Sequence, residues 1–277
     1  MRRMDMIIGI KRKVIDLFDT VYFKLNRLNI PPYSLRVHVG PIEEYGRLPQ
    51  EYIAYFKLLC GLKMTETILD IGCGTGRFAS ELISSPNFFR GEYYGFDVHK
   101  KAIDWATKKI TTHHRKFQFE FVDLWNGHYN PKGKLKASAF SFPYEDAKFD
   151  FVFAMSVFTH LLPKDTENYL RQINRILKPK GKALLTFLLL NGYPKTLSEI
   201  AQKRKHRKGG PIKWQHNDIY SIRYPDRPEV TIAYQESELK RMIVKSNLQL
   251  EKTFYGAWNK AEDYLSYQDI IIVHKKL

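Results

Sequence analysis

The chain has 277 residues, of which 44% are hydrophobic and 14% aromatic, so it can bury one sizeable core and is not a disordered protein. Its two cysteines, Cys60 and Cys73, do not make a disulfide framework and fit a reducing compartment, and no apolar run is long enough to span a membrane. The formal net charge of +16 indicates an acidic partner, such as nucleic acid, anionic lipid or a phosphorylated or carboxylated substrate, although a solvated basic surface explains it equally well.

The first expected element is an amphipathic helix over residues 4–28, in which apolar residues recur at helical spacing with basic residues between them. Residues 1–36 carry eight basic and three acidic side chains, a net charge of +5. The apolar stripe is expected to pack on its own domain, and the alternative is that it lies on a membrane surface. An N-terminal helical extension over 1–62 is therefore predicted, with a stop at Pro31-Pro32, an irregular stretch over 33–50, and a helix over 50–61 that ends at Gly61.

From Thr67 onward, short and continuously apolar runs alternate with helical patterns. Such runs are buried on both faces, so the pattern predicts an α/β doubly wound fold with a parallel sheet between two layers of helices. The expected strands cover residues 67–71, 93–97, 117–122, 149–155 and 182–190, and the expected helices cover 77–84, 100–111 and 164–177, the last ended by Pro179 and Gly181.

Residues 191–230 interrupt this alternation with Gly, Pro and basic residues, and they are interpreted as an insertion or lid after the fifth strand. Within them, residues 195–213 carry seven basic side chains and one acidic one, and the run 203–208 contains most of these bases. The expected remainder is a helix over 236–246 and an antiparallel pair of strands over 248–255 and 269–273, which gives one domain over 63–277 that contains the insertion.

The strongest local signal is Ile68-Leu-Asp-Ile-Gly-Cys-Gly-Thr-Gly-Arg77, a glycine-rich turn between an expected strand and an expected helix. Glycines let the backbone turn sharply and approach a ligand closely, and the amides at the start of the helix face a nucleoside or a carboxylate. Asp97 ends the next strand, 21 residues beyond Gly76, where a carboxylate can accept both hydroxyls of a ribose. The spacing Gly-x-Gly-x-Gly differs from the Gly-x-Gly-x-x-Gly of dinucleotide sites; a dinucleotide site or a plain tight turn are the alternatives.

At these residues the sequence resembles the class I S-adenosylmethionine-dependent methyltransferases, whose first motif, Asp/Glu-x-Gly-x-Gly-x-Gly, matches residues 70–76 at every fixed position. The resemblance covers about residues 65–191 and implies a seven-stranded, mostly parallel sheet with an antiparallel last strand and S-adenosylmethionine as cofactor, with no metal. It also implies the following contacts: Gly72, Gly74 and Gly76 wrap the methionine moiety, Asp70 helps to hold its amino group, Asp97 takes the ribose with Val98 against the adenine, Asp123 reads the adenine amino group with Leu124 beside it, and Met155 lines the sulfonium end. Asp123 has a simpler alternative role, which is to cap a turn.

The methyl acceptor is less well specified. His160, in Ser156-Val-Phe-Thr-His-Leu161, follows the fourth strand, where the family places residues near the transferable methyl group, and it is the candidate general base for a hydroxyl acceptor. The alternative is that His160 only caps or packs at this junction. Residues 156–170, 129–133 and 32–41 resemble bacterial small-molecule members of the family that accompany glycan-building genes, so a small-molecule or saccharide hydroxyl, with an anionic group if the basic charge serves binding, is the expected acceptor.

Six aromatic side chains outside the cofactor half could stack on a sugar, and Arg223 or Arg227 could hold a phosphate or carboxylate. Core or lid packing is the simpler interpretation of each ring. The six are Tyr193, Trp214, Tyr220, Tyr224, Tyr255 and Trp258. Nucleic acid is the rival acceptor, since the run 203–208 would track phosphates, but Ala154-Met-Ser-Val-Phe158 lacks the Asn/Asp-Pro-Pro-Tyr/Phe motif of base amino methyltransferases. A non-catalytic, cofactor-binding scaffold is the third hypothesis. The expected location is cytoplasmic, with peripheral contact at the inner membrane face through residues 1–30 as an option.

Overall fold

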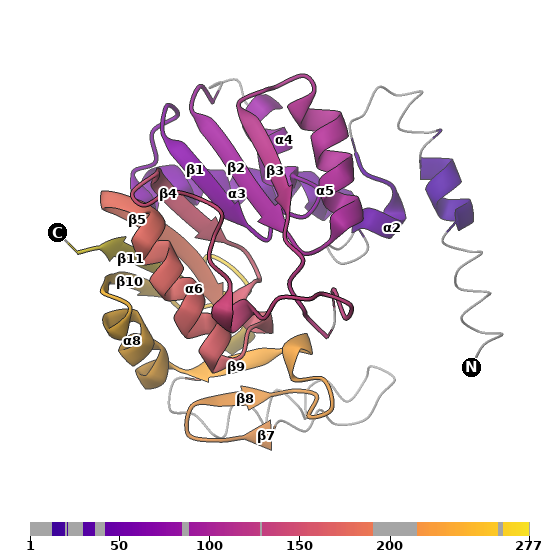
Figure 1. Cartoon of the computed structure of the whole chain (residues 1–277). Helices are drawn as coiled ribbons and strands as arrows, with labels where there is room; N and C mark the ends of the chain where they lie inside the picture. Colours follow the sequence, from indigo (N-terminus) through magenta and orange to yellow (C-terminus); the bar gives the residue numbers. More distant parts are fainter. Residues whose placement is uncertain are drawn as a thin grey trace. The chain divides into compact units, whose positions relative to one another are not determined.

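The computed structural model divides the chain into two compact units, residues 1–65 with 73–121, and residues 66–72 with 122–277. The division falls inside the glycine turn, so the strand before the turn belongs to the second unit and the helix after it belongs to the first. Figure 1 draws both units, and the structure describes residues 13–19, 21, 30–36, 42–84, 89–127, 129–190, 215–259 and 263–276.

Within the described residues, a seven-stranded sheet has the strand order β10-β11-β5-β4-β1-β2-β3. Strand β1 is parallel to β4, β4 to β5, and β2 to β3, whereas β11 is antiparallel to both of its neighbours, β5 and β10. The predicted α/β fold with an antiparallel last strand is therefore confirmed. The strands are β1 (Thr67–Ile71), β2 (Glu92–Asp97), β3 (Phe117–Phe121), β4 (Phe149–Ala154), β5 (Leu177–Phe187), β10 (Leu248–Phe254) and β11 (Asp269–Lys275).

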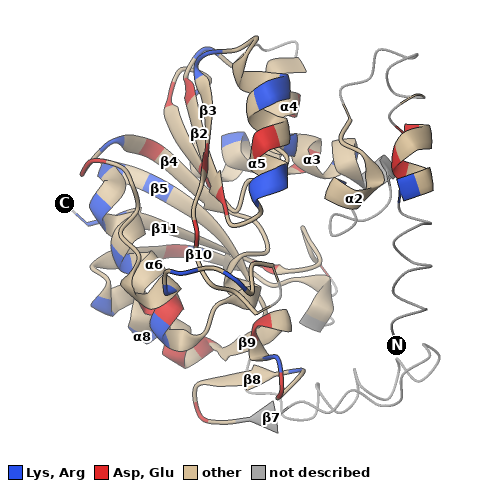
Figure 2. Cartoon of the chain, turned by 45° about the vertical axis from the view of Figure 1, so that its right-hand side comes forward, with Lys and Arg blue, Asp and Glu red and all other residues tan. Residues whose placement is uncertain are grey.

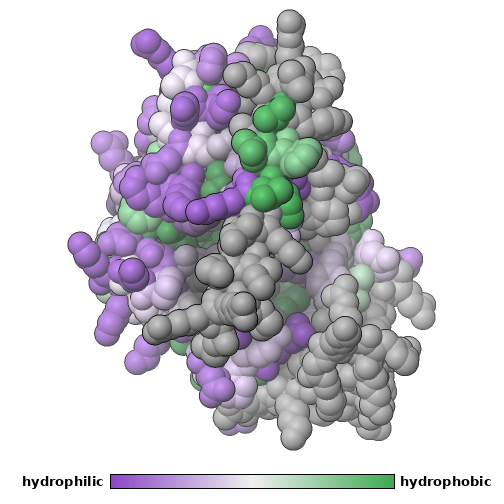
Figure 3. All heavy atoms as spheres, turned by 90° about the vertical axis from the view of Figure 1, so that its right-hand side faces the viewer, coloured by the Kyte–Doolittle hydropathy of each residue, from purple (hydrophilic) through white to green (hydrophobic). Residues whose placement is uncertain are grey.

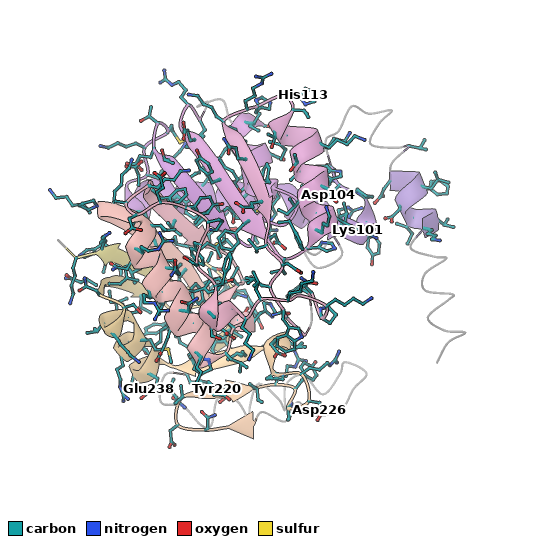
Figure 4. All side chains as sticks on the ribbon, viewed as in Figure 1. Lys101, Asp104, His113, Tyr220, Asp226 and Glu238 are labelled. Atoms are coloured by element: carbon teal, nitrogen blue, oxygen red, sulfur yellow. The ribbon has the colours of Figure 1, made fainter. Side chains whose placement is uncertain are left out.

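The first unit surrounds β2 and β3 with helices. The ring of Tyr93 on β2 stacks on that of Phe117 on β3 at 5.4 Å between centroids, and both are buried. On the outer side of α5, Lys101 and Asp104 are exposed and point away from the strands (Figure 4). Besides the helical residues 13–19 and 21, this unit has the helices α2 (Tyr33–Arg36), α3 (Ile42–Cys60), α4 (Arg77–Ser84) and α5 (Lys100–Ala106), the last continued by a π-helical turn over Thr107–Thr111.

The expectation of an irregular stretch over residues 33–50 is wrong. Helix α3 begins at Ile42 and runs through Gly46 and Pro49, both of which disfavour a helix. Tertiary packing outweighs that preference, because Tyr52 and Phe56 of α3 pack on Phe78 of α4, with ring centroids 6.4 and 5.9 Å apart. The end at Cys60, before Gly61, is as predicted.

The helix expected over residues 4–28 is described at residues 13–19 and 21, which are helical. The expectation that its apolar stripe packs on its own domain is wrong for these residues, since Val14, Leu17 and Phe18 are exposed. No helix in the described part of the chain is long and apolar enough to cross a bilayer.

The second unit has its core between β1, β4, β5 and helix α6 (Pro163–Ile176), beside which α8 (Glu236–Lys245) packs. The rings of Phe158 and Phe187 stack at 4.6 Å in this core. Helix α6 ends one residue earlier than expected, and Pro179 and Gly181 lie within β5 instead of ending the helix. The pairing of β5 with β4 shifts register between Leu177 and Lys182, so Pro179 and Gly181 occupy an irregular part of the strand.

A second sheet, which the sequence did not predict, has the order β6-β9-β8-β7. Strands β7 and β8 lie in the segment interpreted as an insertion, and β6 and β9 lie on either side of it. The sheet is anchored to the core because the Tyr234 hydroxyl donates to the Leu161 carbonyl at 2.7 Å and lies 2.9 Å from Thr166 Oγ1. The basic run 203–208, Tyr193 and Trp214 lie outside the described residues. The strands are β6 (Leu189–Leu190), β7 (Gln215–His216), β8 (Tyr220–Ile222) and β9 (Ile232–Gln235).

Candidate active site

The glycine turn follows the buried end of β1, where Asp70 is enclosed. Gly72, Gly74 and Gly76 all have a positive φ, of 76°, 54° and 72°, which is the conformation that favours glycine. A Cβ at Gly72 would lie 2.5 Å from Val157 Cγ2, whereas a Cβ at Gly74 would have no atom within 4 Å. The backbone at Gly74 therefore has open space beside it, into which a ligand could come close.

Asp97, at the end of β2, is bonded to this turn. The Gly74 amide donates to Asp97 Oδ2 at 2.8 Å, and the His99 amide donates to Oδ1 at 2.7 Å. Burial raises the pKa of the Asp97 carboxyl, and the two amides and the charge of His99 act in the opposite direction. Asp97 thus orders the turn, and each carboxylate oxygen keeps lone-pair capacity for a further donor. Val98, beside it, is half-buried.

Tyr45 of α3 is a contact of the glycine turn that the sequence interpretation missed. Its hydroxyl lies 2.9 Å from Thr75 Oγ1, and both side chains are buried. Burial raises the pKa of Tyr45 to about 12, so the phenol is neutral at physiological pH. The helical spacing of Tyr45, Tyr52 and Phe56 was the available signal, and Gly46 and Pro49 masked it.

In the second unit, Asp123 and the buried Leu124 follow β3 and are held by the chain that folds back over them. The Asp123 carbonyl accepts the amides of Lys134 and Leu135, each at 3.0 Å. The side-chain amide of Asn130 donates to Asp123 Oδ1 at 3.2 Å. The carboxylate of Asp123 therefore contacts a side chain of this returning segment, and its adenine contact stays a prediction.

His160 ends a short 3-10 turn, Phe158–His160, after β4. Its Nδ1 lies 2.8 Å from the backbone carbonyl of Glu229, and because a carbonyl only accepts, Nδ1 carries the proton. In the neutral ring Nε2 is then the acceptor, 3.3 Å from the Tyr129 hydroxyl. The Tyr129 ring stands edge-to-face to the imidazole at 5.1 Å. His160 is therefore held in the tautomer whose basic nitrogen points toward Tyr129. Met155, ahead of this turn, is half-buried.

Glu229 is the second residue that the sequence interpretation missed. Glu229 is only 7% exposed. The carboxylate lies against the 126–130 turn, because a Cβ on Gly127 would be 3.2 Å from Glu229 Oε2. Asp165 is near it: burial, and more weakly the charge of Glu229, raises the pKa of the Asp165 carboxyl. The structure thus brings a buried hydrogen-bond acceptor to the same turns as His160.

The rings proposed for a sugar pocket differ in their surroundings. Trp258 is buried, and its indole N–H donates to the carboxylate of Asp269, which is core packing. Tyr224 is exposed, and two guanidinium groups lie over its ring, those of Arg223 at 5.1 Å and Arg227 at 6.0 Å from the ring centroid. The remaining described rings are Tyr220, which Figure 4 labels on β8, and Tyr255, which bonds Glu236.

Residues 69–185 match a family model described as a methyltransferase domain. The O-methyltransferase cnsE of Penicillium expansum is 29% identical over 167 residues, which are 57% of this chain and 52% of that protein. The 27-O-demethylrifamycin SV methyltransferase of Amycolatopsis mediterranei (strain S699) is 28% identical over 142 residues, 51% of this chain and 46% of that one. The chain thus spans about half the length of these curated relatives.

Among solved structures, an S-adenosylmethionine-dependent methyltransferase from Clostridium acetobutylicum ATCC 824 has a TM-score of 0.54 to this chain at 15% sequence identity. The alignment covers 94% of this chain and 98% of that one. At this identity the likeness establishes the fold, and the fold is the one that the glycine motif predicted.

Proposed function

We propose that this chain, which carries a methyltransferase domain of the class I fold, is an S-adenosylmethionine-dependent methyltransferase. The observation that carries the proposal is the glycine turn, in which Gly72, Gly74 and Gly76 have positive φ. The Gly74 amide of this turn is bonded to Asp97. The open space beside Gly74 fits a closely approaching cofactor. When bound, S-adenosylmethionine supplies an electrophilic methyl group on a sulfonium.

In this proposal the cofactor is held by the residues that the family resemblance assigns. Gly72, Gly74 and Gly76 would face its methionine moiety, and Asp97 would accept the ribose hydroxyls with the lone pairs that the two amides leave. The remaining assigned residues are Asp70 for the amino group, Val98, Asp123 and Leu124 for the adenine, and Met155 beside the sulfonium.

His160 would act as the general base. Methylation of a hydroxyl would form an O–C bond as the methyl–sulfur bond breaks and leaves a neutral thioether. The hydroxyl would lose its proton, and a positioned base would accelerate this loss. The bond from Nδ1 to the Glu229 carbonyl leaves Nε2 as the proton acceptor, and the Tyr129 hydroxyl lies next to that nitrogen. The proton would pass from the acceptor to Nε2, either directly or through the Tyr129 hydroxyl.

The proposed acceptor is a small molecule with several hydroxyls, such as a saccharide in glycan biosynthesis. The buried carboxylate of Glu229 supports this class, because it belongs to the residue that holds His160 and it can accept a hydrogen bond from a second hydroxyl of the acceptor. The names of the two curated relatives, one an O-methyltransferase and the other acting on an O-demethylated small molecule, point the same way. The charge of +16 would favour an acceptor that also carries a phosphate or carboxylate.

A transfer assay tests the proposal. The protein would be given S-adenosylmethionine with a labelled methyl group and a panel of free, phosphorylated and carboxylated sugars, other small hydroxyl compounds and structured RNA. We expect label in an ether of a small hydroxyl compound, and we expect His160→Ala to lower kcat by about 10²–10⁴-fold while S-adenosylhomocysteine still binds.

Each other outcome has a distinct meaning. Label in RNA alone would replace the small-molecule acceptor with the rival that the basic charge favours. Binding of S-adenosylhomocysteine without transfer to any compound would favour the non-catalytic scaffold. Full turnover by the His160→Ala variant would remove the general-base role while leaving the methyltransferase assignment intact.

A further inference from the structure

The N-terminal helix (residues 13–19 and 21) presents its apolar side to solvent. Val14 is 51% exposed, Leu17 66%, Phe18 74% and Val21 49%. These residues are spaced by three and four, so they lie along one stripe of the helix. In a helix that stabilises its own domain this stripe faces the core. Figure 3, which views the side on which Figure 1 draws this helix, shows the stripe as a compact hydrophobic patch.

The opposite side of the N-terminal helix is acidic and makes the internal contacts. Asp16 Oδ1 accepts the Ser34 amide at 2.8 Å, and Asp19 forms a salt bridge with the buried Arg36 at 2.6 Å. Arg36 also donates to the Pro31 carbonyl at 3.2 Å, which fixes it in α2. The acidic residues are therefore paired inward, and the orientation that exposes the apolar stripe is held by specific bonds.

The sequence of the N-terminal segment is basic. Residues 1–36 have a net charge of +5, and the two acids of the described helix are the ones turned toward α2. Lys13, at the start of the described helix, is exposed, and Figure 2 shows the basic and acidic residues of this region. An exposed apolar stripe in a segment of net positive charge, whose two described acids are bonded to α2, complements a surface that is apolar inside and anionic outside.

We propose that the N-terminal helix is a membrane-docking element that lies in the plane of an anionic lipid surface. Leu17 and Phe18, the most exposed of its apolar side chains, enter the boundary between headgroups and acyl chains. Lys13 and the net charge of +5 over residues 1–36 attract the anionic headgroups. The bonds of Asp16 and Asp19 to α2 persist in the bound state and keep the stripe outward.

Vesicle co-sedimentation of the full chain tests this inference. Wild-type protein is expected to sediment with vesicles of phosphatidylcholine mixed with phosphatidylglycerol, and more weakly with phosphatidylcholine alone. The double variant Leu17→Ser/Phe18→Ser is expected to lower the partition constant by at least about tenfold, because two large apolar side chains no longer enter the bilayer. Leu58→Ser is the matched control: Leu58, on α3, is 80% exposed and lies outside the stripe, and its replacement should leave binding unchanged.

Three results would overturn the inference. The first is no binding of the wild-type chain to anionic vesicles, and the second is equal binding by the double variant. The third is a wild-type dimer, in sedimentation velocity, that the double variant converts to monomer without any vesicle binding, which would assign the patch to a second copy of the chain. S-adenosylhomocysteine affinity, measured on the same variants, is expected to stay unchanged, so this result is independent of the proposed function.

Discussion

The glycine turn makes a quantitative prediction through two of its residues. Gly72 and Gly74 both have a positive φ, so alanine at either position costs about 1–2 kcal/mol of backbone strain. At Gly72 the new Cβ would also lie 2.5 Å from Val157 Cγ2, and such overpacking costs about 1–3 kcal/mol more. We expect Gly72→Ala to lower the free energy of unfolding by about 2–5 kcal/mol, and Gly74→Ala by about 1–2 kcal/mol.

Urea denaturation followed by circular dichroism measures both values. The double variant Gly72→Ala/Val157→Ala should recover about 1–3 kcal/mol relative to additive costs, since the clashing methyl groups are gone. Affinity for S-adenosylhomocysteine should fall more in Gly74→Ala, whose Cβ enters the open space proposed for the cofactor. Equal destabilisation by the two single variants, or no recovery with Val157→Ala, would refute the reasoning.

Three further predictions concern the second unit. Burial raises the pKa of Asp269 from 3.8 to about 6. The protonated carboxyl therefore stabilises the fold fully below about pH 4, and this contribution, about 3 kcal/mol, is lost as the pH rises through 6. Asp269→Asn should remove this part of the pH dependence of the free energy of unfolding in urea melts, and an unchanged pH dependence would contradict the prediction. Tyr129→Phe removes the hydroxyl beside His160 Nε2 and should lower kcat about fivefold with little change in KM; wild-type kcat would exclude a role in proton transfer. Glu229→Gln should raise the acceptor KM about tenfold or more, with S-adenosylhomocysteine affinity kept, and an unchanged KM would place the acceptor elsewhere.

The parts of the fold that the sequence predicted well are those with a strong local pattern. The bounds of β1 and α4 agree with the expectation residue for residue. The glycine turn between them marks the end of β1 and the start of α4. The sheet that contains β7, β8 and β9 was missed, since these strands have two to four residues and show no clear alternation. Gly46 and Pro49 hid the start of α3, whose stability comes from packing on α4.

The candidate site shows the same limit. Asp97 and the glycines were found because their spacing relative to strand ends is encoded locally. Glu229 lies 69 residues beyond His160, and only the folding of η4 (Pro228–Val230) brings its carbonyl to the imidazole. Tyr129 reaches the other ring nitrogen from a turn without a periodic pattern. Contacts of this kind depend on tertiary structure, and a single sequence carries no signal for them.

The most direct test of the central claim is calorimetric titration of the full chain with S-adenosylhomocysteine. We predict one binding site in the wild-type protein and a loss of affinity of at least about tenfold in Asp97→Ala, whose ribose contacts are gone. Asp104→Ala is the control, because Asp104 is an exposed acid on α5 that pairs only with Lys100 among the bonds described. No binding by the wild-type chain, or equal affinity in Asp97→Ala, would contradict the account.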